Sequence, residues 1–256
     1  MRFPLFAVLV AFGLFALILV LLEIGRRIGK RTMRDQTEVP AGVGDVEGAV
    51  FALLGLLIAF TFSGAADRFD DRRHLIVEEA NNIGTAWLRV DLLPAEMQPQ
   101  MRQLFRTYLD SRLKVYQKLP DIQASMAELA RSEDYQEKIW DHAVGGCSQT
   151  NSAPCAMLLL PALNQMIDIT TTRTMSTQFH PPAIVFIMLG LVALAASALA
   201  GYSMSGGKRS WIHILSFAAV LAITVYVIVD IEFPRFGLIR VDATDQVLKD
   251  LLNSMK

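Results

Sequence analysis

Residues 49–66 read AVFALLGLLIAFTFSGAA, an unbroken apolar run without a charged side chain. An α-helix rises about 1.5 Å per residue, so about 20 apolar residues are needed to cross the roughly 30 Å hydrocarbon core of a membrane. Similar runs occupy residues 3–22, 182–204 and 211–229. The sequence therefore predicts an all-α polytopic membrane protein with four transmembrane helices.

The overall composition agrees with a membrane protein. The 256 residues include 24 Lys and Arg against 25 Asp and Glu, and 53% of them are hydrophobic. The mean hydropathy is +0.38. This composition excludes a disordered chain and a nucleic-acid binder that relies on bulk positive charge. We expect the lipid bilayer as a partner, and no nucleic acid.

The first apolar run could alternatively be a cleaved secretory signal. It is longer than the usual apolar core of a signal, and Glu23, Arg26 and Arg27 follow it where a small-residue cleavage site would lie. We therefore expect a retained helix.

The spacing of the remaining residues predicts a helical domain between the second and third transmembrane helices. Apolar residues recur every three or four positions, as they do on one face of a helix. The clearest stripes are Ile76, Ala80, Ile83, Trp87 and Val90, then Phe105, Leu109, Leu113 and Tyr116, and then Leu160, Leu163, Ile167 and Thr170. A shorter helix is expected over residues 135–144.

Four segments follow from these patterns. The first transmembrane hairpin takes residues 1–66, with helices at about 3–22 and 49–66, and the extramembrane helical domain takes residues 67–180. A second hairpin takes residues 181–230, with helices at about 182–204 and 211–229. Residues 231–256 form an interfacial segment and a C-terminal amphipathic helix, which we expect to dock on the helical domain.

The distribution of basic residues indicates an orientation. The loops within the two hairpins must lie on one side of the membrane, and Lys and Arg near span ends favour the cytoplasm. These loops carry Arg26, Arg27, Lys30, Arg31, Arg34, Lys208 and Arg209. We therefore expect residues 67–180 and both termini to be extracytoplasmic, although arginines also follow the second and fourth spans.

Cys147 and Cys155 lie in a turn-rich stretch, residues 145–155. In an oxidising extracytoplasmic compartment two cysteines so close in sequence favour a disulfide, and in the cytosol they would remain thiols. Two thiols without a nearby histidine pair do not match a zinc site.

The second transmembrane run offers candidate pore residues. Leu54, Ile58 and Phe62 repeat at every fourth position and could line a narrow hydrophobic constriction. The alternative is that these side chains face lipid or other helices.

Charged residues flank this run and are candidates for a pore mouth. Arg68 and Arg72 share a face of the continuing helix, or alternatively form part of its solvated surface. Asp45 and Glu47 precede the run, and a ring of such residues in an oligomer would favour cations. Asp45 could instead cap the helix.

No pattern supports an enzyme. The sequence contains no glycine-rich phosphate loop, no nucleophile elbow and no Cys-x-x-Cys motif. The four histidines share no ligand spacing, so we expect no cofactor and no metal. They are His74, His142, His180 and His213.

Several short motifs resemble a known family. The second helix is similar to that of bacterial bestrophins, and nearly the whole chain resembles the bacterial bestrophin-like membrane family of unknown function. The first similarity rests on LGLLIAF at residues 54–60, DRF at 67–69, RR at 72–73 and EEANN at 78–82. The second adds FTFSGA at 60–65, RFD at 68–70, residues 77–93 and 164–173, HPP at 180–182 and DIEFPRFG at 230–237.

The resemblance implies a function. Bestrophins are pentameric ion channels, anion-selective in animals, with a hydrophobic neck on the second helix. We accordingly expect a homo-oligomer, a pentamer by resemblance, that conducts small inorganic ions, with anion conduction implied by the resemblance and Leu54, Ile58 and Phe62 as the neck. The alternative is a non-conducting membrane sensor or scaffold whose extracytoplasmic helical domain binds a partner.

The sequence also departs from bestrophins. Bestrophins keep their large soluble part in the cytosol, whereas the basic loops here indicate the opposite side. Phe69 and Asp70 stand where bestrophins usually have two tryptophans, and the chain lacks an acidic run like the calcium clasp of animal bestrophins.

Overall fold

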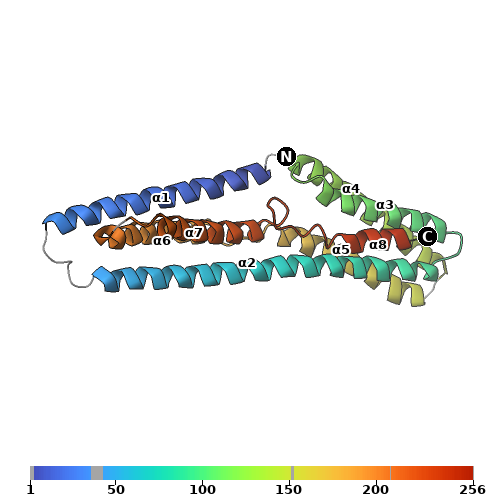
Figure 1. Ribbon diagram of the computed structural model, residues 1–256. Coiled ribbons are helices and arrows are strands. Elements are labelled where there is room, and N and C mark those ends of the chain that lie inside the picture. The colour runs from blue at the N-terminus through green and yellow to red at the C-terminus, as the bar shows by residue number, and fades with distance from the viewer. Residues whose placement is uncertain (1–2, 36–42, 151–152, 208, 256) are drawn as a thin grey trace. The chain divides into compact units, whose positions relative to one another are not determined.

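The computed structural model describes residues 3–35, 43–150, 153–207 and 209–255, and every regular element in these ranges is helical (Figure 1). The long helices are α1 (Phe3–Asp35), α2 (Val43–Leu88), α3 (Gln98–Gln117), α4 (Ile122–Thr150), α5 (Leu160–Ser176), α6 (Ala183–Ser203) and α7 (Trp211–Glu232). Short elements are η1 (Arg89–Leu92), η2 (Cys155–Leu159), η3 (Met204–Gly206) and α8 (Gln246–Ser254).

Four helices are long and apolar enough to cross a membrane, at Val8–Arg34, Gly44–Leu92, Ala183–Gly206 and Trp211–Glu232. The predicted all-α fold with four such helices is confirmed. Two of these helices are longer than their apolar runs. α1 continues to Asp35, and its polar end contains a helix-stabilising pair one turn apart, Arg27 Nε to Glu23 Oε1 at 2.9 Å. α2 has 46 residues and so extends roughly 70 Å, more than twice the hydrocarbon thickness.

The chain forms two compact units, and α2 contributes to both. The first unit comprises Met1–Arg68 and His180–Ile239. Within it α1 lies alongside α6 and α7 (Figure 1). Its apolar core includes Ile18, Leu22, Leu54, Ala193 and Leu221.

Glycines allow α1 and α6 to approach closely. A Cβ atom on Gly25 would lie 1.9 Å from the Ala198 carbonyl oxygen, and one on Gly201 would lie 2.0 Å from the Leu22 carbonyl oxygen. Small residues at such positions let membrane helices pack backbone against backbone. Gly29, one turn after Gly25, continues this contact against Ser205.

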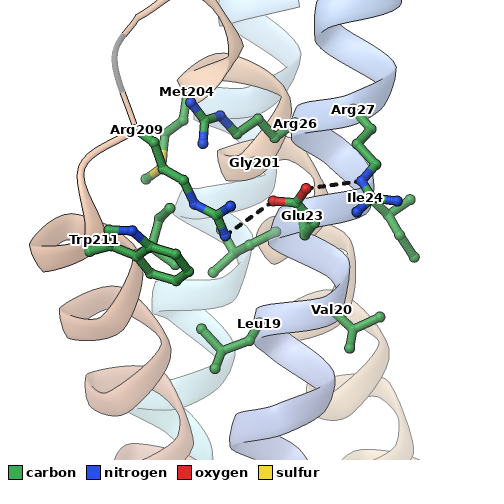
Figure 2. Close-up of a pocket in the computed structure, with 12 residues that line it drawn as sticks. Leu19, Val20, Glu23, Ile24, Arg26, Arg27, Gly201, Met204, Arg209 and Trp211 are labelled. Carbon is green, nitrogen blue, oxygen red and sulfur yellow. Dashed lines mark hydrogen bonds and ion pairs between the residues drawn. The ribbon is translucent and has the colours of Figure 1, made fainter.

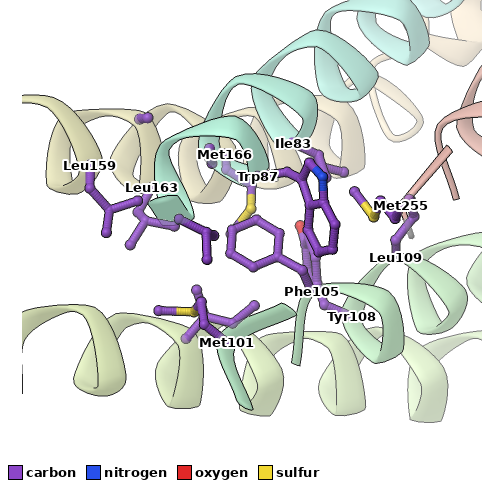
Figure 3. Close-up of a cluster of buried hydrophobic side chains, with 14 of the residues drawn as sticks. Ile83, Trp87, Met101, Phe105, Tyr108, Leu109, Leu159, Leu163, Met166 and Met255 are labelled. Carbon is purple, nitrogen blue, oxygen red and sulfur yellow. The ribbon is translucent and has the colours of Figure 1, made fainter. Parts of the chain in front are cut away.

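The second unit comprises Phe69–Phe179 and Arg240–Lys256. Its core is built from the stripes expected for α2, α3 and α5, and Figure 3 shows Trp87 and Phe105 at its centre. Their ring centroids are 6.0 Å apart in an edge-to-face arrangement. The C-terminal segment belongs to this unit, because Leu248 and Met255 are buried in the same core.

The region around the cysteines differs from expectation. Cys147 and Cys155 form a disulfide with a Cα–Cα distance of 5.4 Å. Residues 145–150 are helical, whereas the sequence indicated a turn there. They belong to α4, which spans 29 residues and is therefore much longer than the helix expected over residues 135–144. Gly146 provides packing space, because a Cβ there would lie 2.6 Å from Leu93 Cδ2.

Candidate functional site

The three side chains expected to form a neck point in different directions. Leu54 is only 5% exposed and packs in the core of the first unit. Ile58 is partly buried against that core, while Phe62 is 45% exposed. An α-helix has about 3.6 residues per turn, so residues four positions apart do not lie on exactly the same face. Along this stripe the side chains change from facing the core at Leu54 to facing outward at Phe62. These residues therefore do not share one exposed face.

A different stripe of α2 is exposed. Ala52, Leu56 and Phe60 repeat at every fourth position on the side away from Leu54, and Leu56 and Phe60 are 52% and 69% exposed. Ser63 continues the stripe and is also exposed. We call Ala52, Leu56, Phe60 and Ser63 the α2 stripe. It is an apolar surface that the chain itself does not cover.

A carboxylate lies beyond each end of the α2 stripe along the helix. Asp45 lies seven residues before Ala52 and Asp67 seven residues after Phe60, which is close to two helical turns, so both lie on the same face. Both are exposed. Asp45 lies within the first turn of α2, so it is not the N-cap residue. Its negative charge there interacts favourably with the helix dipole. Glu47 is half-buried and accepts a hydrogen bond from the Ser203 hydroxyl.

Arg68 is engaged by a buried carboxylate at the end of α7. Its Nη2 lies 2.6 Å and its Nε 2.9 Å from Glu232 Oε2. His180 Nδ1 lies 2.8 Å from the other oxygen of this fully buried carboxylate. Because a buried carboxylate is costly unless it is paired, this cluster holds Arg68 on the Glu232 side of α2.

Arg72 is buried in the second unit. Its Nε donates to the Ser176 carbonyl oxygen at 3.2 Å, and its Nη2 donates to the Phe179 carbonyl oxygen at 3.1 Å. A guanidinium at this place satisfies carbonyl groups at the C-terminal end of α5 and complements the helix dipole. Neither Arg68 nor Arg72 therefore lies on the exposed face that carries Asp67.

A second ion cluster is buried in the second unit. Glu79 accepts hydrogen bonds from Arg112 Nε at 2.6 Å and from Arg173 Nη1. Arg173 Nη2 donates to Asp245 at 3.1 Å, and its guanidinium lies 3.8 Å from the centre of the Tyr116 ring. The cluster links α2, α3, α5 and the start of α8.

Burial alone would lower the pKa of Arg112, but the Glu79 carboxylate outweighs this and holds the pKa above its ordinary value. Arg112 therefore stays charged inside the unit. The helical stripes in the sequence did not predict that Glu79, Arg112 and Arg173 would form this cluster. A signal was available, because Glu79 and Arg112 both fall on otherwise apolar helical stripes.

In the part of the chain that the structure describes, no group of three or more His, Cys, Asp or Glu side chains could hold a metal ion. The geometry thus offers an exposed helix face with carboxylates at its ends and two structural ion clusters.

Comparison with known proteins adds a family and a fold. A family match described as "Bestrophin-like domain" spans residues 5–245. Two variants of a bacterial bestrophin homologue from Klebsiella pneumoniae have similar crystal structures, with TM-scores of 0.70 and 0.67 and 13% identity. Each alignment covers 93% of this chain and 97% of the other.

A crystal structure described as a membrane protein is also similar, with a TM-score of 0.69, 13% identity and coverage of 94% of this chain and 97% of that one. No curated protein sequence matches at a significant level. At such low identity these structures show a shared fold.

Proposed function

Since the chain belongs to the bestrophin-like family, we propose that it is the subunit of an oligomeric ion channel in a bacterial inner membrane, with the α2 stripe lining the conduction path. The observation that carries the proposal is the uncovered apolar stripe with a carboxylate beyond each end. Copies arranged around a symmetry axis would bring these stripes together into a hydrophobic constriction. A pentamer is the arrangement that the resemblance to bestrophins favours.

The proposed neck therefore consists of Leu56 and Phe60, in place of Leu54, Ile58 and Phe62. Leu54 stabilises the subunit's own core. Phe60 is the more exposed of the two neck residues, at 69%.

We expect the purified oligomer to conduct ions in liposomes, and Phe60→Ala to raise the flux several-fold. A smaller side chain at a hydrophobic constriction lowers the barrier to wetting. The measurement is ion flux per reconstituted oligomer. Phe12→Ala is the matched control, because Phe12 on α1 is 67% exposed but lies outside the α2 stripe, and it should leave the flux unchanged.

If folded, reconstituted oligomer passes no ions, the channel proposal fails. The non-conducting sensor or scaffold then becomes the better hypothesis.

We further propose that the path prefers cations over anions. Asp45 and Asp67 lie on the exposed face of α2, whereas Arg68 and Arg72 are engaged elsewhere. Rings of carboxylates attract cations and repel anions. This charge arrangement supports the opposite of the anion preference expected from resemblance to animal bestrophins.

Under a KCl gradient, Asp67→Asn should lower the potassium-to-chloride permeability ratio, and Asp67→Lys should move it towards chloride. The ratio is obtained from the reversal potential. Glu96→Gln removes an exposed carboxylate outside α2 and should leave the ratio unchanged. A chloride-selective wild-type current would contradict the proposed cation preference.

Our proposed orientation keeps residues 67–180 and both termini outside the cytoplasm. The basic loops of the two hairpins support this orientation, and so does a disulfide between Cys147 and Cys155, since such bonds persist in oxidising compartments. In acid-quenched cells, a bulky maleimide should label these cysteines only after reduction. Labelling without reduction, together with a cytoplasm-specific reporter that is active after Lys256, would overturn this orientation.

A further inference from the structure

We propose that a pocket of the first unit binds the phosphodiester headgroup of an anionic phospholipid. The pocket has a volume of about 440 Å³, within the usual range for ligand sites, and is lined by residues of α1, α6, η3 and α7 and by Arg209 (Figure 2). One part of its wall is apolar and includes Leu19, Leu22 and Ile214. The other part carries Arg26, Arg27 and Arg209.

The charges around the pocket are unbalanced. Glu23 is the single carboxylate in the lining, and it pairs with Arg27 Nε at 2.9 Å and with Arg209 Nη2 at 3.3 Å. Figure 2 shows Glu23 between these two arginines, with Arg26 beside them. Three arginines against one glutamate leave a net positive charge that favours an anion.

Arg26 is the residue that points most directly to a ligand. It is only 5% exposed, and its Nε is buried without a hydrogen-bond partner among the described residues. Its one hydrogen bond there is a long one, from Nη2 to the Gly207 carbonyl oxygen at 3.4 Å. A buried guanidinium with an unused donor is costly, and a phosphate oxygen would satisfy it.

The place of the pocket along the helices indicates a lipid as the source of the phosphate. Arg26 and Arg27 follow the apolar run of α1, and Arg209 lies two residues before the start of the run in α7, so the arginines lie where hydrocarbon gives way to water. The Arg209 guanidinium lies 3.8 Å from the centre of the Trp211 ring, a side chain typical of this interface. In Figure 2 the apolar Leu19 and Val20 lie below the arginines, where acyl chains would continue from the headgroup. A small anion would bind the arginines but would not cover that apolar wall.

Trp211 provides a direct test, because it lines the pocket and is 55% exposed. The full-length protein is reconstituted in phosphatidylcholine vesicles containing a rising fraction of brominated phosphatidylglycerol, whose bromines quench nearby tryptophans. The part of the quenching that is lost in Trp211→Phe belongs to this pocket. Brominated phosphatidylcholine and inorganic phosphate are the comparison probes.

We expect phosphatidylglycerol to quench Trp211 at lower mole fractions than phosphatidylcholine does. Arg26→Gln and Arg209→Gln should each weaken this preference about fivefold, while Arg31→Gln, an equal charge change on the exposed side of α1, should retain it. The Arg209 side chain is 39% exposed, so its variant tests the site even if Arg26→Gln does not fold.

Equal quenching by the two lipids would overturn the proposal, and so would an unchanged preference in a folded arginine variant. Loss of the preference on adding millimolar inorganic phosphate would assign the pocket to a free anion and also overturn it.

Discussion

Glu79→Ala should lower the free energy of unfolding by about 3 to 5 kcal/mol, the cost typical of removing one partner from a buried ion pair. Glu79 and Arg112 are both fully buried, and Arg173 is nearly so. Without the carboxylate, Arg112 would keep its charge and lose its ionic partner in the interior. The change therefore leaves two clustered cations without the anion that joins them.

The effect can be measured by denaturant titration of the detergent-solubilised protein. Tryptophan fluorescence is a suitable signal, because Trp87 and Trp140 both belong to the second unit. Glu78→Ala is the matched control, since the neighbouring Glu78 is exposed, and it should change stability by no more than about 0.5 kcal/mol. Equal stabilities of the two variants would show that the cluster does not hold this unit together.

Gly201→Ala should disrupt the first unit severely. The new Cβ would lie 2.0 Å from the Leu22 carbonyl oxygen, and the obstacle is backbone that cannot rotate away. We expect a loss of at least about 1 to 3 kcal/mol, the usual cost of overpacking a core, because α1 and α6 must separate along their contact.

Gly190→Ala provides the comparison on the same helix. Nothing lies within 4 Å of the Cβ position at Gly190, and alanine favours a helix over glycine by about 0.5 to 1 kcal/mol. The two variants should therefore differ clearly in the yield of monodisperse protein and in melting temperature in detergent. Similar behaviour of both would contradict the close packing of α1 on α6.

Hydropathy and helical spacing were sufficient to predict much of the fold. Charge-free runs located the four membrane-capable helices, and the stripes containing Ile76 and Phe105 correctly identified core faces of α2 and α3. Helix ends were harder to predict. The polar end of α1 carries no strong stop signal, whereas the glycines before Cys147 indicated a turn that the packing of α4 overrides. Both segments remain helical.

The candidate site was less predictable, for a physical reason. The membrane part of α2 is apolar all round, so its sequence does not indicate that Leu54 faces the core and Leu56 the outside. Local sequence patterns also cannot predict ion pairs between residues far apart in the chain, such as Arg68 and Glu232. The close helix contact at Gly25 and Gly201 was not predicted either, because glycines occur in several apolar runs and their positions alone do not show which of them face another helix.

Imaging of the protein in lipid nanodiscs by electron cryomicroscopy tests the proposed pore most directly. We expect several copies around one axis, with Leu56 and Phe60 of every copy facing it and water-accessible space between them. A solitary chain, or a ring in which lipid acyl chains cover these two side chains, would contradict a conduction path along α2.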